Sequence, residues 1–386
     1  MGRGCPGTEM KLYLPLLLLV TAPLFGQNAA GRVAALQEAA KQIGAGNLAA
    51  AEEWLKPLAA QDDPVALNLL GVVRTGQGQT VDAETLFRRA IEEGPTLAGP
   101  HVNLARLYGK SRAEDAITEL ARALGLAPDL EQAALALREI AAAAAADLVR
   151  SGKKEQALAL MLRAHRVLPQ DPDLLVETAL AAMEDGLYHD AEGLLTAALA
   201  IRATFPRALY ALARAYLGAG KGQLAEAAMR KYLALKPADA TAQYGLGYIL
   251  ISEQKVAEAR AAFERSLALE PRQTESLFQL GDIASQEGKP ELATERYRKV
   301  LDADPRHGGS LTGLGALAYR AGKLDEAQSY LERAIAAAAS YYKAHYYYAL
   351  TLKKLGRKED SDREFQVATG LQKRDAPVTR LAEDRK

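Results

Sequence analysis

The stretch "YGLGYILISEQKVAEARAAFERSLALEP", from Tyr244 to Pro271, decides the fold because its residues recur along the chain. Alanine returns at a step of 34 residues, in a column made of Ala157, Ala191, Ala225, Ala259, Ala293 and Ala327. Proline keeps the same step at Pro237, Pro271 and Pro305. Periodicity on this scale is typical of stacked structural repeats, each of which contacts its neighbours. It therefore predicts a scaffold in place of a single enzyme core.

Two further columns keep the same step and mark the inside of each repeat. Small residues form the first column, at Ala179, Ala213, Gly247, Gly281, Gly315 and Ala349. Glycine forms the second column, at Gly152, Gly186, Gly220, Gly288, Gly322 and Gly356, with Gln254 as the interruption. Glycine is the residue that most readily takes the left-handed conformation that ends a helix. The second column therefore predicts a turn between two helices.

One repeat reads as a helical hairpin. In the stretch from Ala208 to Gly220, the apolar residues Leu209, Leu212 and Tyr216 have the i, i+3, i+7 spacing of one helix face. The following stretch has a second apolar face and ends at Pro237, which cannot continue a helix. One hairpin cannot bury its apolar face alone, so the repeats must stack.

These columns carry a resemblance to a known family. Its pattern of Leu, Leu-Gly, Ala, aromatic, Ala and Pro is matched by Leu67, Leu70, Gly71, Ala83, Phe87, Ala90 and Pro95. A second match is formed by Leu311, Leu314, Gly315, Ala327, Leu331 and Ala334. The chain resembles the tetratricopeptide repeat family. The resemblance implies an all-α fold, an α-solenoid in which about ten helical hairpins form a right-handed superhelix.

The expected organisation follows the repeats. Residues 1–26 are expected to form a signal peptide, with Met10 as a second candidate start. The remaining ranges are 31–130 for repeats 1 to 3, 131–171 for repeat 4, 172–375 for repeats 5 to 10, and 376–386 for a polar tail.

Repeats 3 and 4 depart from the pattern. The turn "YGKSRAEDA" of repeat 3 lacks glycine at the usual place. Repeat 4 is longer, because Pro128 precedes Ala157 by 29 residues whereas Pro169 precedes Ala191 by 22. Seven extra residues are about two helical turns, so its first helix is expected to protrude or to start early. The extension is either a tolerated insertion or a hinge or docking point.

The N-terminal residues predict export. Lys11 precedes an apolar run from Leu12 to Phe25, and small and polar residues follow it. Fourteen helical residues reach roughly 21 Å, short of a hydrocarbon core of roughly 30 Å, so the run is typical of a signal peptide. No stable membrane insertion is expected after cleavage. We expect a periplasmic or extracellular protein, in a bacterial setting. Cys5, the single cysteine, precedes the run and cannot be a lipid-carrying cysteine after it.

Charge and motifs argue against several classes of function. The 48 basic and 48 acidic residues leave no net charge, so nucleic acid is not an expected partner. The five histidines are dispersed, without the i, i+4 pair of a zinc helix. The "GAGKG" sequence at Gly218 to Gly222 lacks the first glycine and the Ser or Thr of a phosphate loop. No catalytic residue, cofactor site or metal site is predicted.

A binding site is instead expected on the concave face, which the family resemblance assigns to the first helices. The candidate residues are Arg207, Tyr210, Arg214, Tyr244, Tyr248, Phe278, Asp282, Tyr319, Lys343, Tyr346 and Lys353. Aromatic and arginine side chains anchor peptide interfaces, although tyrosines here could also pack against neighbouring repeats. In the cluster "SYYKAHYYYAL", Tyr346 should face the groove, Tyr347 the opposite side and Tyr348 the core.

Two functions remain open from the sequence. The first is an exported, non-catalytic scaffold that binds a peptide or an extended protein segment in its groove. The second is a structural or assembly part of an exopolysaccharide or surface-appendage secretion system, in which flat outer faces dock larger proteins and the groove is secondary. The aromatic cluster could also stack on sugar rings. The family's two-carboxylate clamp for chaperone tails is absent, because Asn68 and Val72, then Val102 and Arg106, occupy the corresponding places.

Overall fold

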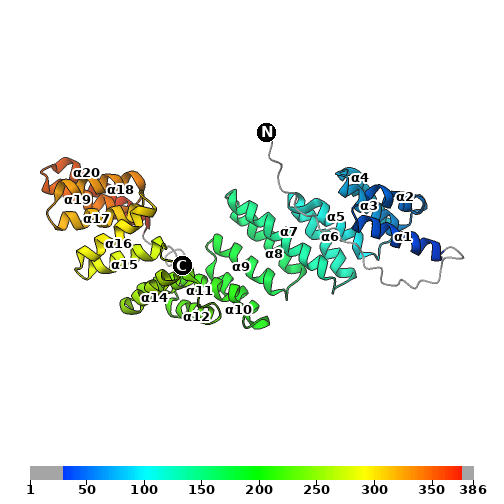
Figure 1. Ribbon diagram of the computed structural model, residues 1–386, viewed down its shortest axis with the longest axis horizontal. Helices are drawn as coiled ribbons and strands as arrows, with labels where there is room; N and C mark the ends of the chain where they lie inside the picture. The colour runs from blue at the N-terminus through cyan, green and yellow to red at the C-terminus, as the bar shows by residue number, and fades with distance from the viewer. Residues whose placement is uncertain (1–28, 376–386) are drawn as a thin grey trace, which may run out of the picture. The chain divides into compact units, whose positions relative to one another are not determined.

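The computed structural model describes residues 29–375, which are helical apart from short connections. Contacts divide the chain into two compact units, which we call the N-terminal unit (to Ala215) and the C-terminal unit (from Tyr216). The boundary falls inside α11 (Pro206–Gly218). Figure 1 labels the helices of both units, and each unit is described by itself.

The N-terminal unit consists of helical hairpins in which a first helix packs on the second helix that follows it. Its first helices are α1 (Ala29–Gly44), α3 (Pro64–Gly76), α5 (Ala98–Tyr108), α7 (Glu131–Arg150) and α9 (Pro172–Glu184). Its second helices are α2 (Leu48–Ala59), α4 (Thr80–Glu93), α6 (Ala113–Leu126), α8 (Lys154–Val167) and α10 (Tyr188–Ile201). A short 3-10 helix, η1 (Gly109–Arg112), precedes α6.

The C-terminal unit begins with the end of α11 and α12 (Gly222–Leu235), and four hairpins follow. Their first helices are α13 (Ala240–Ser252), α15 (Thr274–Gln286), α17 (Gly308–Arg320) and α19 (Tyr342–Lys354). Their second helices are α14 (Val256–Leu269), α16 (Pro290–Ala303), α18 (Leu324–Ala337) and α20 (Lys358–Asp375). Between residues 29 and 375, nine hairpins thus lie wholly inside one unit. The expected sixth repeat corresponds to α11 and α12, which the boundary divides.

The predicted column of small residues on the first helices packs against large side chains of the second helices. Phe263 of α14 is fully buried, and a Cβ atom on Gly247 of α13 would lie 2.5 Å from its ring. Tyr297 of α16 stands in the same relation to Gly281 of α15, at 2.7 Å. A small residue on the first helix therefore makes room for a ring on the second helix. Burying such a ring stabilises the hairpin by roughly 1.5–3 kcal/mol.

The turns between paired helices depend on one left-handed residue. Gly220 and Gly288 have φ angles of 72° and 71°. Gln254, which interrupts the glycine column, takes the same conformation with a φ angle of 60°. After it, the Lys255 backbone N–H donates to the Leu250 carbonyl at 2.9 Å and closes the end of α13. The backbone of this turn is thus retained without glycine.

The extra residues of repeat 4 lie in α7, which has 20 residues where α9 has 13. The helix starts early and does not protrude, because Ala133 and Leu137 in its first two turns are buried. They belong to one hydrophobic cluster that runs from Leu36 to Ala181. The core of the N-terminal unit is therefore continuous through α7.

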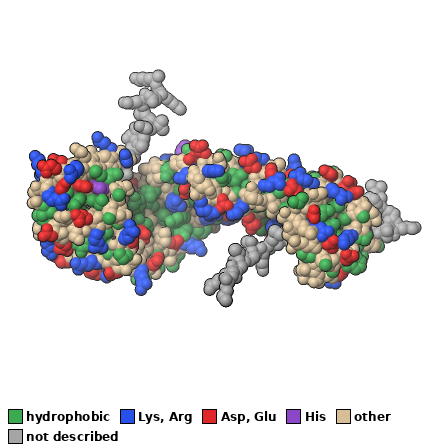
Figure 2. Space-filling view, turned by 90° about the horizontal axis from the view of Figure 1, so that it is seen from above, with side chains coloured by type: hydrophobic (Ala, Val, Ile, Leu, Met, Phe, Trp, Pro, Cys, Tyr) green, Lys and Arg blue, Asp and Glu red, His purple; other side chains and the backbone are tan. Residues whose placement is uncertain are grey.

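Charges of both signs are mixed on the surface of the described residues. Figure 2 shows Lys and Arg side chains interspersed with Asp and Glu over the face that it presents. Between residues 29 and 375, every helix is too short or too polar to cross a lipid bilayer. The expected signal peptide and the polar tail lie outside the described residues.

Candidate functional site

The structure divides the predicted binding residues between the two units. Arg207, Tyr210 and Arg214 lie on α11 in the N-terminal unit. The other eight lie on the first helices of the C-terminal unit, namely Tyr244, Tyr248, Phe278, Asp282, Tyr319, Lys343, Tyr346 and Lys353. We call the sides of α13, α15, α17 and α19 that carry these eight residues the first-helix face.

On α11, one predicted residue is joined to the preceding first helix by an ion pair. The Arg207 guanidinium forms an ion pair with Glu177 of α9 at 2.6 Å. Tyr210 is half-buried and Arg214 is exposed. Arg207 therefore bridges two neighbouring first helices, which is a structural role at this position.

The two tyrosines of α13 differ in burial: the Tyr244 ring packs against the core and the Tyr248 ring faces solvent. The Tyr244 ring lies 5.9 Å from the buried Phe263 ring and 6.4 Å from the Tyr248 ring, measured between centroids. Burial raises the pKa of Tyr244 above its ordinary value, and the charge of Glu275 acts in the same direction. Tyr248 keeps 47% of its surface exposed. Tyr244 thus supports a neighbouring ring that is free to contact a partner.

On α15, the predicted residues serve the interior more than the surface. The half-buried Phe278 ring lies 5.0 Å from the His307 ring and 6.1 Å from the Tyr297 ring. Asp282 accepts a hydrogen bond of 2.6 Å from the Tyr297 hydroxyl. Burial raises the pKa of Asp282, whereas the Tyr297 hydroxyl and the charges of Lys343 and His307 oppose that shift. Tyr297 needs a partner for its buried hydroxyl, and Asp282 supplies it.

Between α15, α17 and α19, tyrosines and cations form a continuous strip. Tyr319 of α17 lies 6.4 Å from Tyr347 of α19, and the Lys354 ammonium lies 4.1 Å above the Tyr319 ring. Arg320 donates to the Tyr347 hydroxyl at 3.1 Å and to the Ser285 hydroxyl at 3.3 Å. Cations over aromatic rings are held without a carboxylate. The sequence analysis did not include Arg320, Tyr347 and Lys354 among the binding residues, although each is adjacent in sequence to a predicted residue.

All three predicted residues on α19 are exposed. Tyr346 keeps 45% of its surface exposed, and its ring lies 5.5 Å from Tyr347 and 5.8 Å from Phe365 of α20. Lys343 and Lys353 are exposed on either side of it. Two perpendicular ring contacts fix the orientation of Tyr346 and leave the rest of its surface accessible.

The expectation that Tyr347 points away from the groove is wrong. Its ring packs on Tyr319 of the preceding first helix, and its hydroxyl accepts from Arg320. Successive residues of an α-helix are about 100° apart, so Tyr347 lies on the flank beside Tyr346 and not behind it. Tyr348 is half-buried against the α18 side, where its hydroxyl donates to Glu332 at 2.8 Å.

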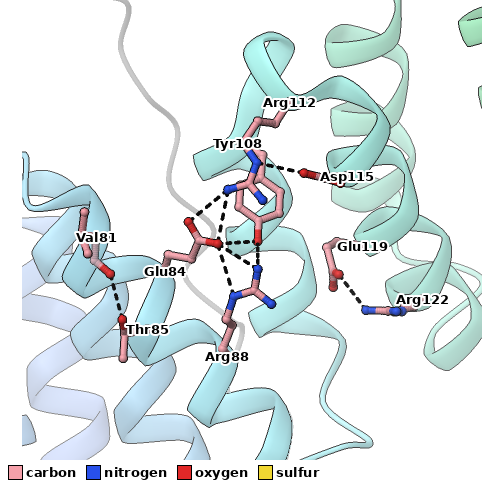
Figure 3. Close-up of polar contacts among 9 residues, drawn as sticks. All are labelled: Val81, Glu84, Thr85, Arg88, Tyr108, Arg112, Asp115, Glu119 and Arg122. Atoms are coloured by element: carbon pink, nitrogen blue, oxygen red, sulfur yellow. Dashed lines mark hydrogen bonds and ion pairs between the residues drawn. The ribbon is translucent and has the colours of Figure 1, made fainter.

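A separate polar cluster lies in the N-terminal unit at the atypical turn of repeat 3. Figure 3 shows Glu84 of α4 accepting hydrogen bonds from Tyr108 at 2.9 Å, Arg88 at 2.9 Å and Arg112 at 3.1 Å. Burial works to raise the pKa of Glu84, but these donors together lower it. The left-handed residue here is Gly109, inside η1. The cluster therefore joins α4 to a turn that lacks the usual glycine.

The described residues offer little for catalysis or metal binding. Between residues 29 and 375, no three His, Cys, Asp or Glu side chains gather as metal ligands. The His307 ring lies 2.9 Å from the Ser310 hydroxyl, but Ser310 is fully buried and His307 Nδ1 accepts from its backbone N–H, which caps α17. Three residues at the places of the chaperone-tail clamp, Asn68, Val72 and Val102, are buried in the core.

Family comparison identifies the repeats. Sequence models described as tetratricopeptide repeat match residues 210–276 and 284–344. These two segments are tetratricopeptide repeats. Together they make up less than half of the chain, and the helices described above continue the same hairpin pattern over the other residues between 29 and 375. No curated protein matches the chain in sequence.

Several solved structures of helical repeat proteins are similar to this chain. A tetratricopeptide repeat protein from Parabacteroides merdae has a TM-score of 0.51 at 18% identity and covers 61% of this chain and 93% of its own. The PilF protein of Pseudomonas aeruginosa has a TM-score of 0.47 at 20% identity and covers 60% and 98%. MamA from Desulfovibrio magneticus has a TM-score of 0.40 at 22% identity and covers 44% and 97%. The first likeness shows an all-α fold of stacked hairpins.

Proposed function

We propose that the chain is an exported, non-catalytic scaffold that binds a peptide or an extended protein segment on the first-helix face. The observation that carries the proposal is the exposure of Tyr248 and Tyr346, at 47% and 45%. Exposed tyrosines are common anchors of protein interfaces, because they bury a large apolar area and keep a hydroxyl for hydrogen bonding.

The supporting rings make these two tyrosines suitable anchors. Tyr248 rests beside Tyr244, and Tyr346 rests between Tyr347 and Phe365. A side chain that is already held in place loses less conformational entropy on binding. The first-helix face therefore offers two prearranged aromatic contacts on α13 and α19, with half-buried Phe278 and Tyr319 on the helices between them.

Export is the second element of the proposal. It rests on the apolar run from Leu12 to Phe25, which lies outside the described residues. The full chain, expressed in a bacterial host with its leader, should lose it on reaching the periplasm. Mass spectrometry of the purified periplasmic protein gives the new N-terminus, and an intact leader on cytoplasmic protein would contradict export.

A role in exopolysaccharide or surface-appendage secretion is the alternative. Exposed tyrosine rings can contact sugar rings as well as side chains, so Tyr248 and Tyr346 would serve either partner. A soluble polysaccharide competitor separates the two functions. If a polysaccharide displaces the bound partner and a peptide does not, the result favours the alternative.

The experiment compares a Tyr248→Ala, Tyr346→Ala variant with a matched variant on second helices, Leu224→Ala, Leu292→Ala, whose side chains are also exposed. Helicity is checked first by circular dichroism. Partners captured by the wild-type protein are trimmed by protease to their bound segments, and these segments are synthesised for affinity measurement. The tyrosine variant should lose at least tenfold in affinity, because interface anchors contribute about 2 kcal/mol or more. Equal affinity for all three proteins would contradict the proposal.

A further inference from the structure

Two neighbouring first helices of the C-terminal unit contain cations and no carboxylates. Neither α17 nor α19 contains an Asp or Glu. Their cationic residues with side chains on the surface are Arg320, Lys343, Lys353 and Lys354. The second helices that follow are different, since α18 and α20 both contain acidic residues in their first turns. Within the first-helix face, the excess of positive charge therefore lies on α17 and α19.

The four cations are not neutralised by ion pairs. Lys343 and Lys353 have neither an ion pair nor a hydrogen bond with the part of the chain that the structure describes. Arg320 and Lys354 contact Tyr347 and Tyr319. By contrast, Lys299 of α16 pairs with Glu295 at 2.7 Å on a second helix of the same unit. The cations of the first-helix face remain available to an incoming carboxylate.

Nearby carboxylates do not take this role. Asp282 of α15 is close enough for Lys343 to oppose the rise of its pKa, but its oxygen is hydrogen-bonded to Tyr297. Glu275 lies in the first turn of α15, two first helices away from α19. Neither carboxylate forms an ion pair with Lys343 or Lys353.

Helix electrostatics account for three of the cations and not for the fourth. Arg320, Lys353 and Lys354 lie in the last turns of their helices, where positive charge is favourable. Lys343 is the second residue of α19, where the helix dipole disfavours a cation. Within the described residues Lys343 has no direct ion pair, and Asp282 acts on it only through longer-range attraction. The charge of Lys343 therefore destabilises the N-terminal end of α19, and a bound anion would remove this unfavourable interaction.

The positions of the two lysines on α19 determine how far apart the charged groups of a partner must be. Lys343, Tyr346 and Lys353 follow i, i+3 and i+10 on α19, which places them on one side of the helix. Ten residues of α-helix rise about 15 Å, so the two ammonium groups flank the exposed tyrosine ring over that length. An extended chain covers about 15 Å in four to five residues, at about 3.3 Å per residue.

We propose that α17 and α19 bind an acidic segment of a partner protein, with two carboxylates four to five residues apart on either side of an apolar or aromatic residue. The carboxylates pair with Lys343 and Lys353, and the central side chain packs on Tyr346. This inference rests on the proposed function of the first-helix face and adds the chemistry of its partner. Nucleic acid, which is also anionic, offers phosphates at a closer spacing and is one arm of the test.

The test uses the full mature chain and a fluorescein-labelled seven-residue peptide with glutamates at positions 1 and 6, phenylalanine at position 3 and glycine or serine elsewhere. A second peptide carries glutamine in place of both glutamates, and a labelled single-stranded oligonucleotide is the third probe. The test variant carries Lys343→Gln and Lys353→Gln together. The matched control variant carries Lys299→Gln on α16 and Lys323→Gln in the turn before α18. Affinities are measured by fluorescence anisotropy at 50 and 300 mM salt.

The glutamate peptide should bind the wild-type protein about threefold to twentyfold more tightly than the glutamine peptide at low salt, and the difference should shrink at high salt. The Lys343→Gln, Lys353→Gln variant should lose this preference, whereas the control variant should keep it. Equal binding of the two peptides would overturn the inference, as would an equal loss in the control variant or tighter binding of the oligonucleotide. The glutamine peptide's dependence on Tyr346, measured with Tyr346→Ala, separates failure of this inference from failure of the proposed function.

Discussion

Gln254 has the left-handed backbone of the glycine column, with a φ angle of 60°. A side chain in this conformation costs roughly 1–2 kcal/mol relative to glycine, before the higher chain entropy of unfolded glycine is subtracted. We therefore expect Gln254→Gly to raise the free energy of unfolding by about 0.5–1 kcal/mol, measured by urea denaturation. Gly220→Ala is the reverse control and should lower it. A Gln254→Gly variant less stable than wild type would contradict this account of the turn.

Asp282 links the pH dependence of stability to the packing of Tyr297. Burial raises its pKa in the folded state above the ordinary value of 3.8. The folded state then holds the proton more tightly, so this contribution to stability is present below pH 3.8 and is lost as pH rises through the folded pKa. Asp282→Asn keeps an acceptor for the Tyr297 hydroxyl and removes the titration.

The Asp282→Asn variant should therefore gain stability relative to wild type as pH rises from about 4 to 7. Urea denaturation at several pH values within this range measures the difference. A pH-independent difference would show that Asp282 has an ordinary pKa. The sign would be reversed if the first-helix cations, and not burial, controlled this carboxyl group.

At the scale of elements, two hairpins share a polar contact that other repeats lack. His101 of α5 lies 2.6 Å from Glu119 of α6, and His345 of α19 lies 2.6 Å from Glu364 of α20. Both histidines stand four residues before the small-residue column, and both glutamates stand three residues after the alanine column. In the fifth repeat the same two positions hold leucine, at Leu175 and Leu194. Because His and Glu are replaced together by two leucines, the two positions are in contact and can be filled by either a polar pair or an apolar pair.

We expect Glu364→Ala to lower the free energy of unfolding by about 1–3 kcal/mol, because it removes the partner of a buried imidazole. Replacing both residues, as His345→Leu with Glu364→Leu, should bring stability back to about the wild-type level, since a buried polar pair adds little over apolar packing. Thermal and urea denaturation of the two variants give the comparison. Additive losses in the double variant would count against a shared contact.

The hairpins could be predicted from sequence because their decisive residues recur at a fixed step. Gly247 and Phe263 are such residues. Their contact within one hairpin predicts the same packing at the equivalent positions of the other repeats. The binding residues were harder, because exposure depends on neighbours from several helices. Asp282 occupies a position expected at the groove, yet a tyrosine in the next helix draws its carboxylate inward. The sequence pattern could not reveal this hydrogen bond, because Phe and Tyr occur at equivalent positions of different repeats and only Tyr has a hydroxyl.

At the scale of the whole molecule, the 34-residue step predicts one run of repeats, whereas the contacts divide the chain inside α11. Arg207, Tyr210 and Arg214 consequently belong to the N-terminal unit, apart from the other predicted binding residues. A repeat step fixes the packing of each helix on its neighbours and contains no signal for such a division. The expected binding role of α11 stays a prediction, and the first-helix face is a property of the C-terminal unit alone.

Site-specific photo-crosslinking tests the central claim most directly. A benzoylphenylalanine is placed at Tyr248 or Tyr346 and, as controls on second helices, at Leu224 or Leu292, and the full chain is irradiated in cells that produce it. The account predicts crosslinks to one segment of a partner protein from Tyr248 and Tyr346, and none to that segment from Leu224 or Leu292. Crosslinks confined to the second-helix positions would contradict the first-helix face as the binding surface.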